Sequence, residues 1–246
     1  MTRYDDDLRY DKGRSYRKCV MMVNYHIYQL KAIAIALTLG GGFIDAYTFM
    51  EKGGTLAAGQ TGNLVFFGID MARHNLPGIW TKLLTFLAFI IGLSLTTVIA
   101  EKGKLKYWRA WALCPLTVLC VIVGCIPDNV PNAFVVPLLS FGMAMQNVAF
   151  DKIEGEGYNN IFATGNLKIA VIQLTKYYLT GDRKLRKSGI NFLYLVVGFA
   201  IGACLAAICD QYFHQKTIWI ASLYLMIVNA FYMRSAFKKQ SHPSST

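Results

Sequence analysis

Hydrophobic residues gather into runs long enough to cross a membrane, separated by short polar stretches. Such runs occupy residues 32–50, 83–100, 110–127, 133–150, 188–209 and 217–233. An α-helix needs about 20 mainly apolar residues to cross the hydrocarbon core of a bilayer. The pattern therefore predicts an all-α, polytopic membrane protein with about six transmembrane helices.

One short polar motif interrupts this pattern twice. Its copies are Thr61, Gly62, Asn63 and Thr164, Gly165, Asn166. Each copy follows an apolar run with polar side chains in its interior, Asp45 in the first case and Gln146 and Asn147 in the second. Two copies at equivalent positions, each flanked by long apolar segments, indicate an internal duplication.

The pattern divides the chain into one transmembrane domain and two polar tails. We expect the N-terminal tail at residues 1–29, the transmembrane domain at residues 30–237 and the C-terminal tail at residues 238–246. Within the domain, the first repeat covers about residues 30–127 and the second about residues 133–237. The highly charged first stretch has no small-residue cleavage site, so we expect no signal peptide.

The composition supports a membrane protein. Of the 246 residues, 54% are hydrophobic and only 16% are charged, and the mean hydropathy is +0.37. Ordinary soluble domains carry about 25% charged residues. The net charge of +11 fits basic cytoplasmic loops and contact with anionic lipid better than it fits nucleic-acid binding.

The positions of Lys and Arg predict the topology. They crowd into the N-terminal tail, residues 101–109, residues 151–187 and the C-terminus. Six spans with two non-spanning motif segments place all of these stretches on the cytoplasmic side, as the positive-inside bias requires. Eight spans would move residues 101–109 outside, but they stay an alternative because buried helices can be polar. We therefore expect a protein of the cell (cytoplasmic) membrane with both termini in the cytoplasm.

Six spans in two copies make each repeat a three-span unit. An odd number of crossings inverts the second unit relative to the first, and the two motif segments are then broken or re-entrant. Inverted repeats with such segments recur in secondary transporters and channels. With eight spans the repeats would instead be parallel.

The motif residues have the chemistry of a polar site within a membrane. Thr is a favourable helix N-cap, Gly lets the backbone approach closely, and Asn both donates and accepts hydrogen bonds. A helix that begins at Thr61 or Asn63 would direct unpaired N–H groups and a positive dipole end toward an anion or polar group. Asp45 is an ionisable residue inside a span and could hold a cation or a proton. The candidate binding residues are Asp45, Thr61, Gly62, Asn63, Gln146, Asn147, Thr164, Gly165 and Asn166.

The same residues could instead serve only to pack helices. The motif would then cap and kink two helices at their contact, and its polar groups would bond across the interface at about 0.6 kcal/mol each. The glycines at 40–42, just before Asp45, likewise permit a kink or the close approach of a neighbouring helix.

Signatures of enzymes and metal sites are missing from the sequence. No Ser stands in a G-x-S-x-G turn, no two of the six Cys form a CxxC pair, and the four His lie in loops or tails. We therefore expect no catalytic residues, no metal and no cofactor. The expected partners are the lipid bilayer and a small polar or ionic substrate, and a homo-oligomer stays open.

The signatures together resemble the YoaK-type bacterial membrane proteins, a family with a domain of unknown function. The matching positions are Gly42, Asp45, Ala46, Thr61, Gly62, Asn63, Gln146, Asn147, Thr164, Gly165 and Asn166. The resemblance covers residues 30–237 and implies a small multi-span protein of the bacterial cytoplasmic membrane, without assigning any residue a role. The chain departs from the pattern at Val148 and carries a charge at Lys168, which affects the symmetry of the two motif sites.

The leading hypothesis is a small secondary transporter or permease with a site between the two repeats. A non-transporting scaffold or sensory partner, whose motifs only pack helices, is the first alternative. A membrane-embedded enzyme acting on lipid or quinone is the second, and it needs a reactive constellation that the sequence does not display.

Overall fold

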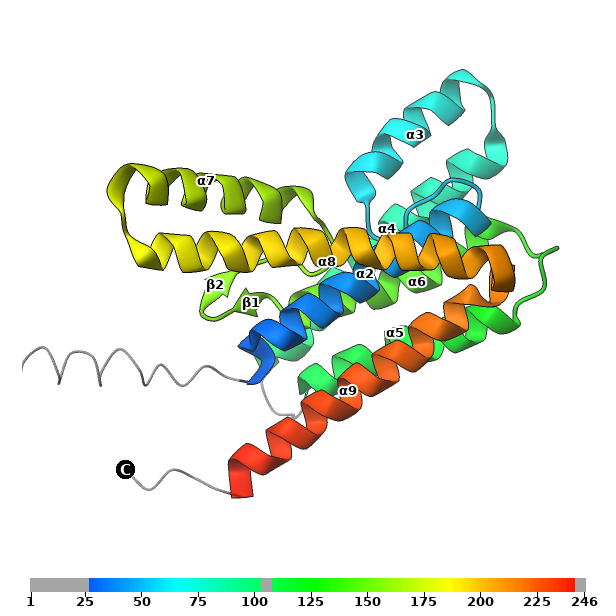
Figure 1. The fold of residues 1–246 in the computed structure, drawn as a ribbon. Helices are drawn as coiled ribbons and strands as arrows, with labels where there is room; N and C mark the ends of the chain where they lie inside the picture. The colour runs from blue at the N-terminus through cyan, green and yellow to red at the C-terminus, as the bar shows by residue number, and fades with distance from the viewer. Residues whose placement is uncertain (1–26, 103–107, 242–246) are drawn as a thin grey trace, which may run out of the picture.

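The computed structural model describes residues 27–102 and 108–241, and nearly all of them are helical (Figure 1). The first half contains η1 (Ile27–Gln29), α2 (Lys31–Glu51), α3 (Gln60–Ala72), α4 (Leu76–Lys102) and α5 (Trp108–Cys125). The second half contains α6 (Asn132–Ala149), β1 (Lys152–Ile153), β2 (Glu156–Gly157), α7 (Thr164–Thr180), α8 (Arg183–Phe213), η2 (His214–Lys216) and α9 (Thr217–Ser241). The all-α prediction therefore holds, apart from one short antiparallel strand pair. Most of the predicted N-terminal tail lies outside the described residues.

Within the described residues, five helical stretches are long and apolar enough to cross a membrane. They are Lys31–Glu51, Leu76–Lys102, Trp108–Cys125, Asn132–Ala149 and Arg183–Ala236. The last stretch contains α8, η2 and most of α9. The chain is thus a nearly all-α protein with several candidate membrane spans.

Several helices extend into stretches that the sequence assigned to polar loops. α8 begins at Arg183 inside the basic stretch, because the Asp182 side chain caps it by accepting a hydrogen bond from the Lys184 N–H at 2.8 Å. α9 likewise continues to Ser241, into the predicted C-terminal tail. An apolar run indicates only the part of a helix that lipid or protein covers. It therefore predicts where a helix lies better than it predicts where the helix begins and ends.

The six long helices form a bundle in which α2, α5 and α8 run one way and α4, α6 and α9 run the other (Figure 1). α2 packs along α8 and α6 packs along α4, and these are the two most extensive contacts between helices. α5 packs on α6 as α9 packs on α2, and α5 also packs on α9. Exchanging α2 with α6, α4 with α8 and α5 with α9 leaves this set of contacts unchanged.

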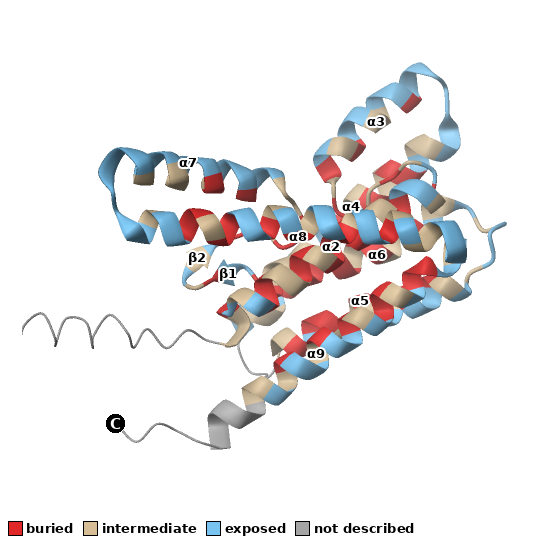
Figure 2. Cartoon of the chain, viewed as in Figure 1, coloured by how far each residue is buried: buried red, intermediate tan, exposed pale blue. Residues whose placement is uncertain are grey.

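The two shorter helices, α3 and α7, each begin near the middle of the bundle and run outward (Figure 1). α3 packs on α4 and runs toward the end where α2 finishes, whereas α7 packs on α8 and runs toward the end where α6 finishes. Figure 2 shows that burial is concentrated on the central helices, while much of α3 and α7 is exposed. The starts of both short helices therefore lie against the most buried part of the protein.

Glycines bring the central helices into backbone contact. A Cβ atom at Gly42 would collide with the carbonyl oxygen of Phe199, and one at Gly202 with that of Leu39. α2 is one unbroken helix through its three glycines. The glycine run lets α2 approach α8 closely.

Candidate functional site

The Asn of the first motif copy fixes the loop that precedes α3. Its Nδ2 donates to the Leu56 carbonyl at 2.7 Å, and its Oδ1 accepts from the Leu56 N–H at 2.9 Å. Leu56 lies seven residues before Asn63, so this two-point contact folds residues 52–59 back over the start of the helix. Asn63 is 2% exposed, and both ends of its buried amide are satisfied.

The second motif copy makes the same contact. The Asn166 Nδ2 donates to the Asn159 carbonyl at 2.6 Å, and its Oδ1 accepts from the Asn159 N–H at 3.1 Å, again across seven residues. Nδ2 also donates to the Phe162 carbonyl at 3.0 Å. Asn63 and Asn166, which the sequence assigned to binding, therefore hold their own loops in place.

The motif threonines do not cap their helices, so that expectation was wrong. α3 begins at Gln60 with Gly59 as N-cap, and α7 begins at Thr164 with Ala163 as N-cap, and neither N-cap side chain makes a cap hydrogen bond. Gly and Ala carry no side-chain acceptor, and each Thr already lies in the first helical turn. Both threonines are exposed.

Asp45 reaches the first loop from α2. It is 5% exposed, and its Oδ1 accepts a hydrogen bond from the Ala58 N–H at 2.7 Å. Thr48, one turn later, accepts from the Ala57 N–H at 3.1 Å. The buried carboxylate is therefore partnered, as a charge inside a span must be, and α2 shapes the loop before α3.

Gln146 anchors the corresponding loop in the second half. Its Nε2 donates to the Asn160 Oδ1 at 3.1 Å, and the Asn160 Nδ2 donates to the Phe150 carbonyl at 2.6 Å. Asn147, the next residue along α6, is half-buried.

We use the name central cavity for a space of about 430 Å³ between the starts of α3 and α7. It is lined by Asp45, Leu56, Gly59, Thr61, Gly62, Ile161, Phe162, Ala163, Thr164, Gly165 and Phe199. The Thr-Gly pairs of both motif copies thus face one space, which Asp45 also reaches. Five of the nine candidate residues meet here, while the other four hold loops or lie elsewhere on α6.

This arrangement can bind a polar group. The first N–H groups of an α-helix have no partner within the helix, and the helix N-terminus carries a partial positive charge. Two such N-termini and one carboxylate border the central cavity, while Leu56, Phe162 and Phe199 supply apolar contact surface. A small cavity with few polar groups among apolar ones is typical of a solute site.

Sequence reasoning missed three polar residues that position the motif helices: Gln60, Ser140 and Asn160. The Gln60 Nε2 donates to the Ser140 Oγ at 3.2 Å, and Ser140 in turn donates to the Thr85 carbonyl at 3.0 Å. This chain ties the start of α3 to α6 and α4. Gln60 directly precedes the first motif and Asn160 lies shortly before the second, so proximity to the motifs was the available signal.

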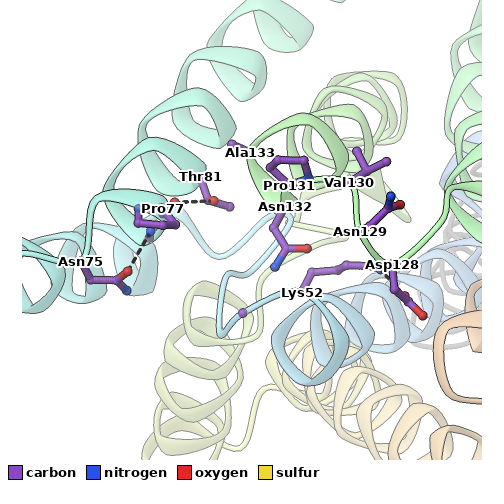
Figure 3. Close-up of a pocket in the computed structure, with 12 residues that line it drawn as sticks. Lys52, Asn75, Pro77, Thr81, Asp128, Asn129, Val130, Pro131, Asn132 and Ala133 are labelled. Atoms are coloured by element: carbon purple, nitrogen blue, oxygen red, sulfur yellow. Dashed lines mark hydrogen bonds and ion pairs between the residues drawn. The ribbon is translucent and has the colours of Figure 1, made fainter.

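A second cavity, of about 400 Å³, lies at the end of the bundle where α2 finishes (Figure 3). We call it the α2-end cavity; it is lined by Lys52, Gly53, Asn75, Pro77, Gly78, Thr81, Asp128, Asn129, Val130, Pro131, Asn132 and Ala133. The Lys52 Nζ lies 3.9 Å from the Asp128 Oδ1. One cation therefore faces one anion across this cavity.

A buried ion pair fastens the outer end of α3 to α4. The Lys82 Nζ lies 2.6 Å from the Asp70 Oδ2, and the Asn75 Nδ2 donates to the Asp70 Oδ1 at 2.9 Å. Burial raises the pKa of Asp70, but the hydrogen bonds from Lys82 and Asn75 outweigh it and hold this pKa below its ordinary value. α3 is thus held at its start by the Gln60 contacts and at its end by this pair.

Comparison with known proteins identifies the family of this chain. A family model described as "Protein of unknown function (DUF1275)" matches residues 33–231, which include every candidate residue named above. The chain is also 22% identical over 193 residues to the UPF0700 transmembrane protein YoaK of Bacillus subtilis (strain 168), covering 75% of this chain and 85% of that protein. No solved structure matches the chain. The resemblance to YoaK-type proteins is confirmed, and the chain belongs to the DUF1275 family of membrane proteins of unknown function.

Proposed function

We propose that the protein is a small secondary transporter or permease whose substrate site is the central cavity. The observation that carries the proposal is that Asp45, Thr61 and Gly62 of one half and Thr164 and Gly165 of the other line the same space. Non-helical backbone at membrane depth is tolerated where it is buried in protein or lines a wet cavity. Helix N-termini that face such a cavity are a recurring feature of transporter sites.

The proposed topology has six crossings, made by α2, α4, α5, α6, α8 and α9. α8 and α9 count as two crossings because they run in opposite directions (Figure 1). α3 and α7 are re-entrant, since each starts mid-bundle and returns toward the end where the preceding long helix finished. α2 and α6 run in opposite directions, so the two units are inverted. The contacts between helices are unchanged when the two halves are exchanged, which supports two copies of one unit.

The charged residues support an orientation in which α2 begins at the cytoplasmic face. Lys31, Arg109, Arg183 and Lys187 all lie at the start of a helix that runs away from this end. Basic residues near membrane spans favour the cytoplasmic side. Both termini of the transmembrane domain then face the cytoplasm.

The groups around the central cavity suit a small polar or ionic solute. A polar or anionic part of the solute would meet the N-termini of α3 and α7, as anions do at helix starts elsewhere. A proton or Na⁺ that couples to transport would meet the Asp45 carboxylate, which lines the central cavity.

Replacing Asp45 by Asn is expected to abolish or uncouple transport while the protein stays folded in the membrane. Asn keeps the size of the side chain and an oxygen that can accept from the Ala58 N–H, but it removes the charge. Flux of small polar and ionic solutes into proteoliposomes, measured by radiolabel uptake and by electrophysiology on supported membranes, checks this. We expect a loss of at least about tenfold, the equivalent of ~1.4 kcal/mol.

The matched control is Asp151→Asn, which removes an exposed carboxylate just after α6. It should transport at the rate of the unchanged protein. Unaltered flux of a transported solute through Asp45→Asn would remove Asp45 from the mechanism, and failure of every solute to move would favour the alternative below.

One observation favours an alternative to transport, in which the protein is a non-transporting scaffold. Asn63 and Asn166 bind their own loops instead of facing the central cavity, as expected if the motif serves only folding. Under this alternative, substitution of either Asn lowers thermal stability in detergent without changing a response to any ligand. Under the transport proposal, the same substitutions lower flux as well, because the loops line the cavity.

A further inference from the structure

A pocket rich in basic residues lies where α2 and α8 both begin. It encloses about 360 Å³ and is lined by Lys31, Glu154, Arg183, Arg186, Lys187, Ile190 and Asn191. Glu154 is already engaged, since its Oε2 lies 2.6 Å from the Lys187 Nζ and accepts from the Asn191 Nδ2 at 3.0 Å. The remaining lysine and two arginines give this basic pocket an excess of positive charge.

The fold itself does not require the excess positive charge of the basic pocket. The α2-end cavity is built from the end of α2 and the starts of α4 and α6, and the basic pocket from the turn after α6 and the starts of α8 and α2. These are the same junctions once the two halves are exchanged. At the start of α4 stand Asn75, Pro77 and Thr81, and the single cation, Lys52, faces Asp128. A set of side chains with no net charge therefore suffices to build this junction.

Aromatic rings hold two of the cations in position. The Lys31 Nζ lies 3.8 Å from the centre of the Tyr194 ring, and the Arg186 guanidinium lies 5.8 Å from that of Tyr177. Such cation–π contacts orient a charge without neutralising it. Guanidinium groups present a planar fork that matches phosphate oxygens, so Arg183 and Arg186 favour a phosphate-bearing ligand.

An apolar surface continues from the basic pocket along α8. Leu193, Val197 and Ile201 follow the pocket on this helix and are 41%, 45% and 46% exposed. In a membrane protein this surface meets acyl chains, directly beside the cluster of cations. A ligand with a charged head and apolar tails would therefore occupy both features at once.

We propose that the basic pocket binds the phosphodiester head group of an anionic phospholipid, whose acyl chains lie along the exposed face of α8. Basic pockets beside membrane spans are a recognised site for acidic head groups, and each Lys or Arg near such a surface strengthens binding by about fivefold. The head group sits between Lys31 and the two arginines, and Ile190 marks the start of the apolar path.

The double variant Arg183→Gln/Arg186→Gln tests this site. Native mass spectrometry of the purified protein, titrated with phosphatidylglycerol, should show affinity reduced by about 25-fold, or about fivefold for each cation. The matched control is Lys168→Gln/Lys184→Gln, which removes two exposed cations that do not line the pocket. Its affinity should stay within about twofold of the unchanged protein.

Three outcomes would overturn the proposal. An equal loss in the control variant would mean that binding follows the general surface charge. Equal binding of zwitterionic phosphatidylcholine would mean that the head-group charge does not matter. Complete displacement of the lipid by millimolar inorganic phosphate would assign the pocket to a free anion. All substituted side chains are exposed, and monodisperse elution with an unchanged far-UV circular dichroism spectrum checks that the variants fold.

Discussion

Replacement of Lys82 by Met is expected to destabilise the protein by about 3–5 kcal/mol, the cost typical of removing one partner from a buried ion pair. Lys82 is 4% exposed, and its Nζ lies 2.6 Å from the carboxylate of Asp70, whose side chain is 13% exposed. Met fills a similar volume but leaves that carboxylate without its counter-ion. Because the pair joins α3 to α4, we expect the outer end of α3 to loosen first.

Thermal unfolding in detergent, followed by intrinsic fluorescence, measures this loss. The double variant Asp70→Asn/Lys82→Met should recover most of it, because no unpaired charge remains. The control Lys187→Met removes a cation whose side chain is 62% exposed and is paired with Glu154, and it should cost no more than about 1 kcal/mol. A Lys82→Met loss no larger than this control would contradict the role of the pair.

The pH dependence of this contribution has a definite sign. The pKa of Asp70 in the folded protein lies below its ordinary value, so the stabilisation is complete above the ordinary pKa. It is lost as the pH falls through the lowered pKa. The stabilities of Lys82→Met and the unchanged protein should therefore converge on acidification.

The variants Asn63→Ala and Asn166→Ala are each expected to lose about 2–4 kcal/mol. Each substitution removes a two-point contact and leaves one backbone N–H and one C=O, on Leu56 or Asn159, without a partner. Each unsatisfied buried group costs about 1–3 kcal/mol. The two Asn residues are 2% and 1% exposed, whereas Leu56 and Asn159 are half-buried. Water can therefore replace part of the lost bonds, and the expected loss lies in the lower part of the summed range.

The same thermal unfolding assay applies to these variants, with Asn147→Ala as the control. Asn147 is a half-buried Asn on α6, and its truncation should cost less than about 1 kcal/mol. Asn63→Asp keeps the acceptor for the Leu56 N–H but places a buried carboxylate oxygen against the Leu56 carbonyl. It should therefore lose at least as much stability as Asn63→Ala. Losses for the two motif variants that match the Asn147→Ala loss would show that the loops do not depend on the motif.

The positions of the long helices were predictable from the sequence, and their ends were not. Each predicted apolar run coincides with one long helix of the structure, and only residues 126–127 and Phe150 lie just beyond a helix end. The agreement arises because burial in lipid or protein requires the same residue types. Hydrophobicity cannot report the polar continuation of a helix, which Asp182 illustrates by capping α8 inside a basic stretch.

The central cavity was predictable only in part. From the duplication we predicted one site lined by Asp45 and both motif copies. In the structure, Asp45 and both Thr-Gly pairs line the same cavity. The bonding of Asn63 and Asn166 to a backbone seven residues earlier depends on the loop conformation, which the motif alone does not specify. The basic pocket could not be predicted from the sequence for a different reason. It combines Lys31 with residues at the start of α8, which are far from Lys31 in the sequence.

The most direct test of the shared cavity links the two motif threonines chemically. The double variant Thr61→Cys/Thr164→Cys, with the six native cysteines replaced, is treated with a short bifunctional thiol reagent. A protease site introduced in the connection between α5 and α6 then separates the halves unless they are cross-linked. The control pair Thr61→Cys/Thr180→Cys places the second thiol at the far end of α7.

Gel electrophoresis after cleavage reads the result. We expect the Thr61→Cys/Thr164→Cys protein to keep its halves joined, while the control pair separates. Mixed single-cysteine variants should give no joined product, which shows that the link forms within one chain. Separation of the Thr61→Cys/Thr164→Cys halves, with both thiols reactive toward a maleimide, would contradict a cavity shared by the two motif copies.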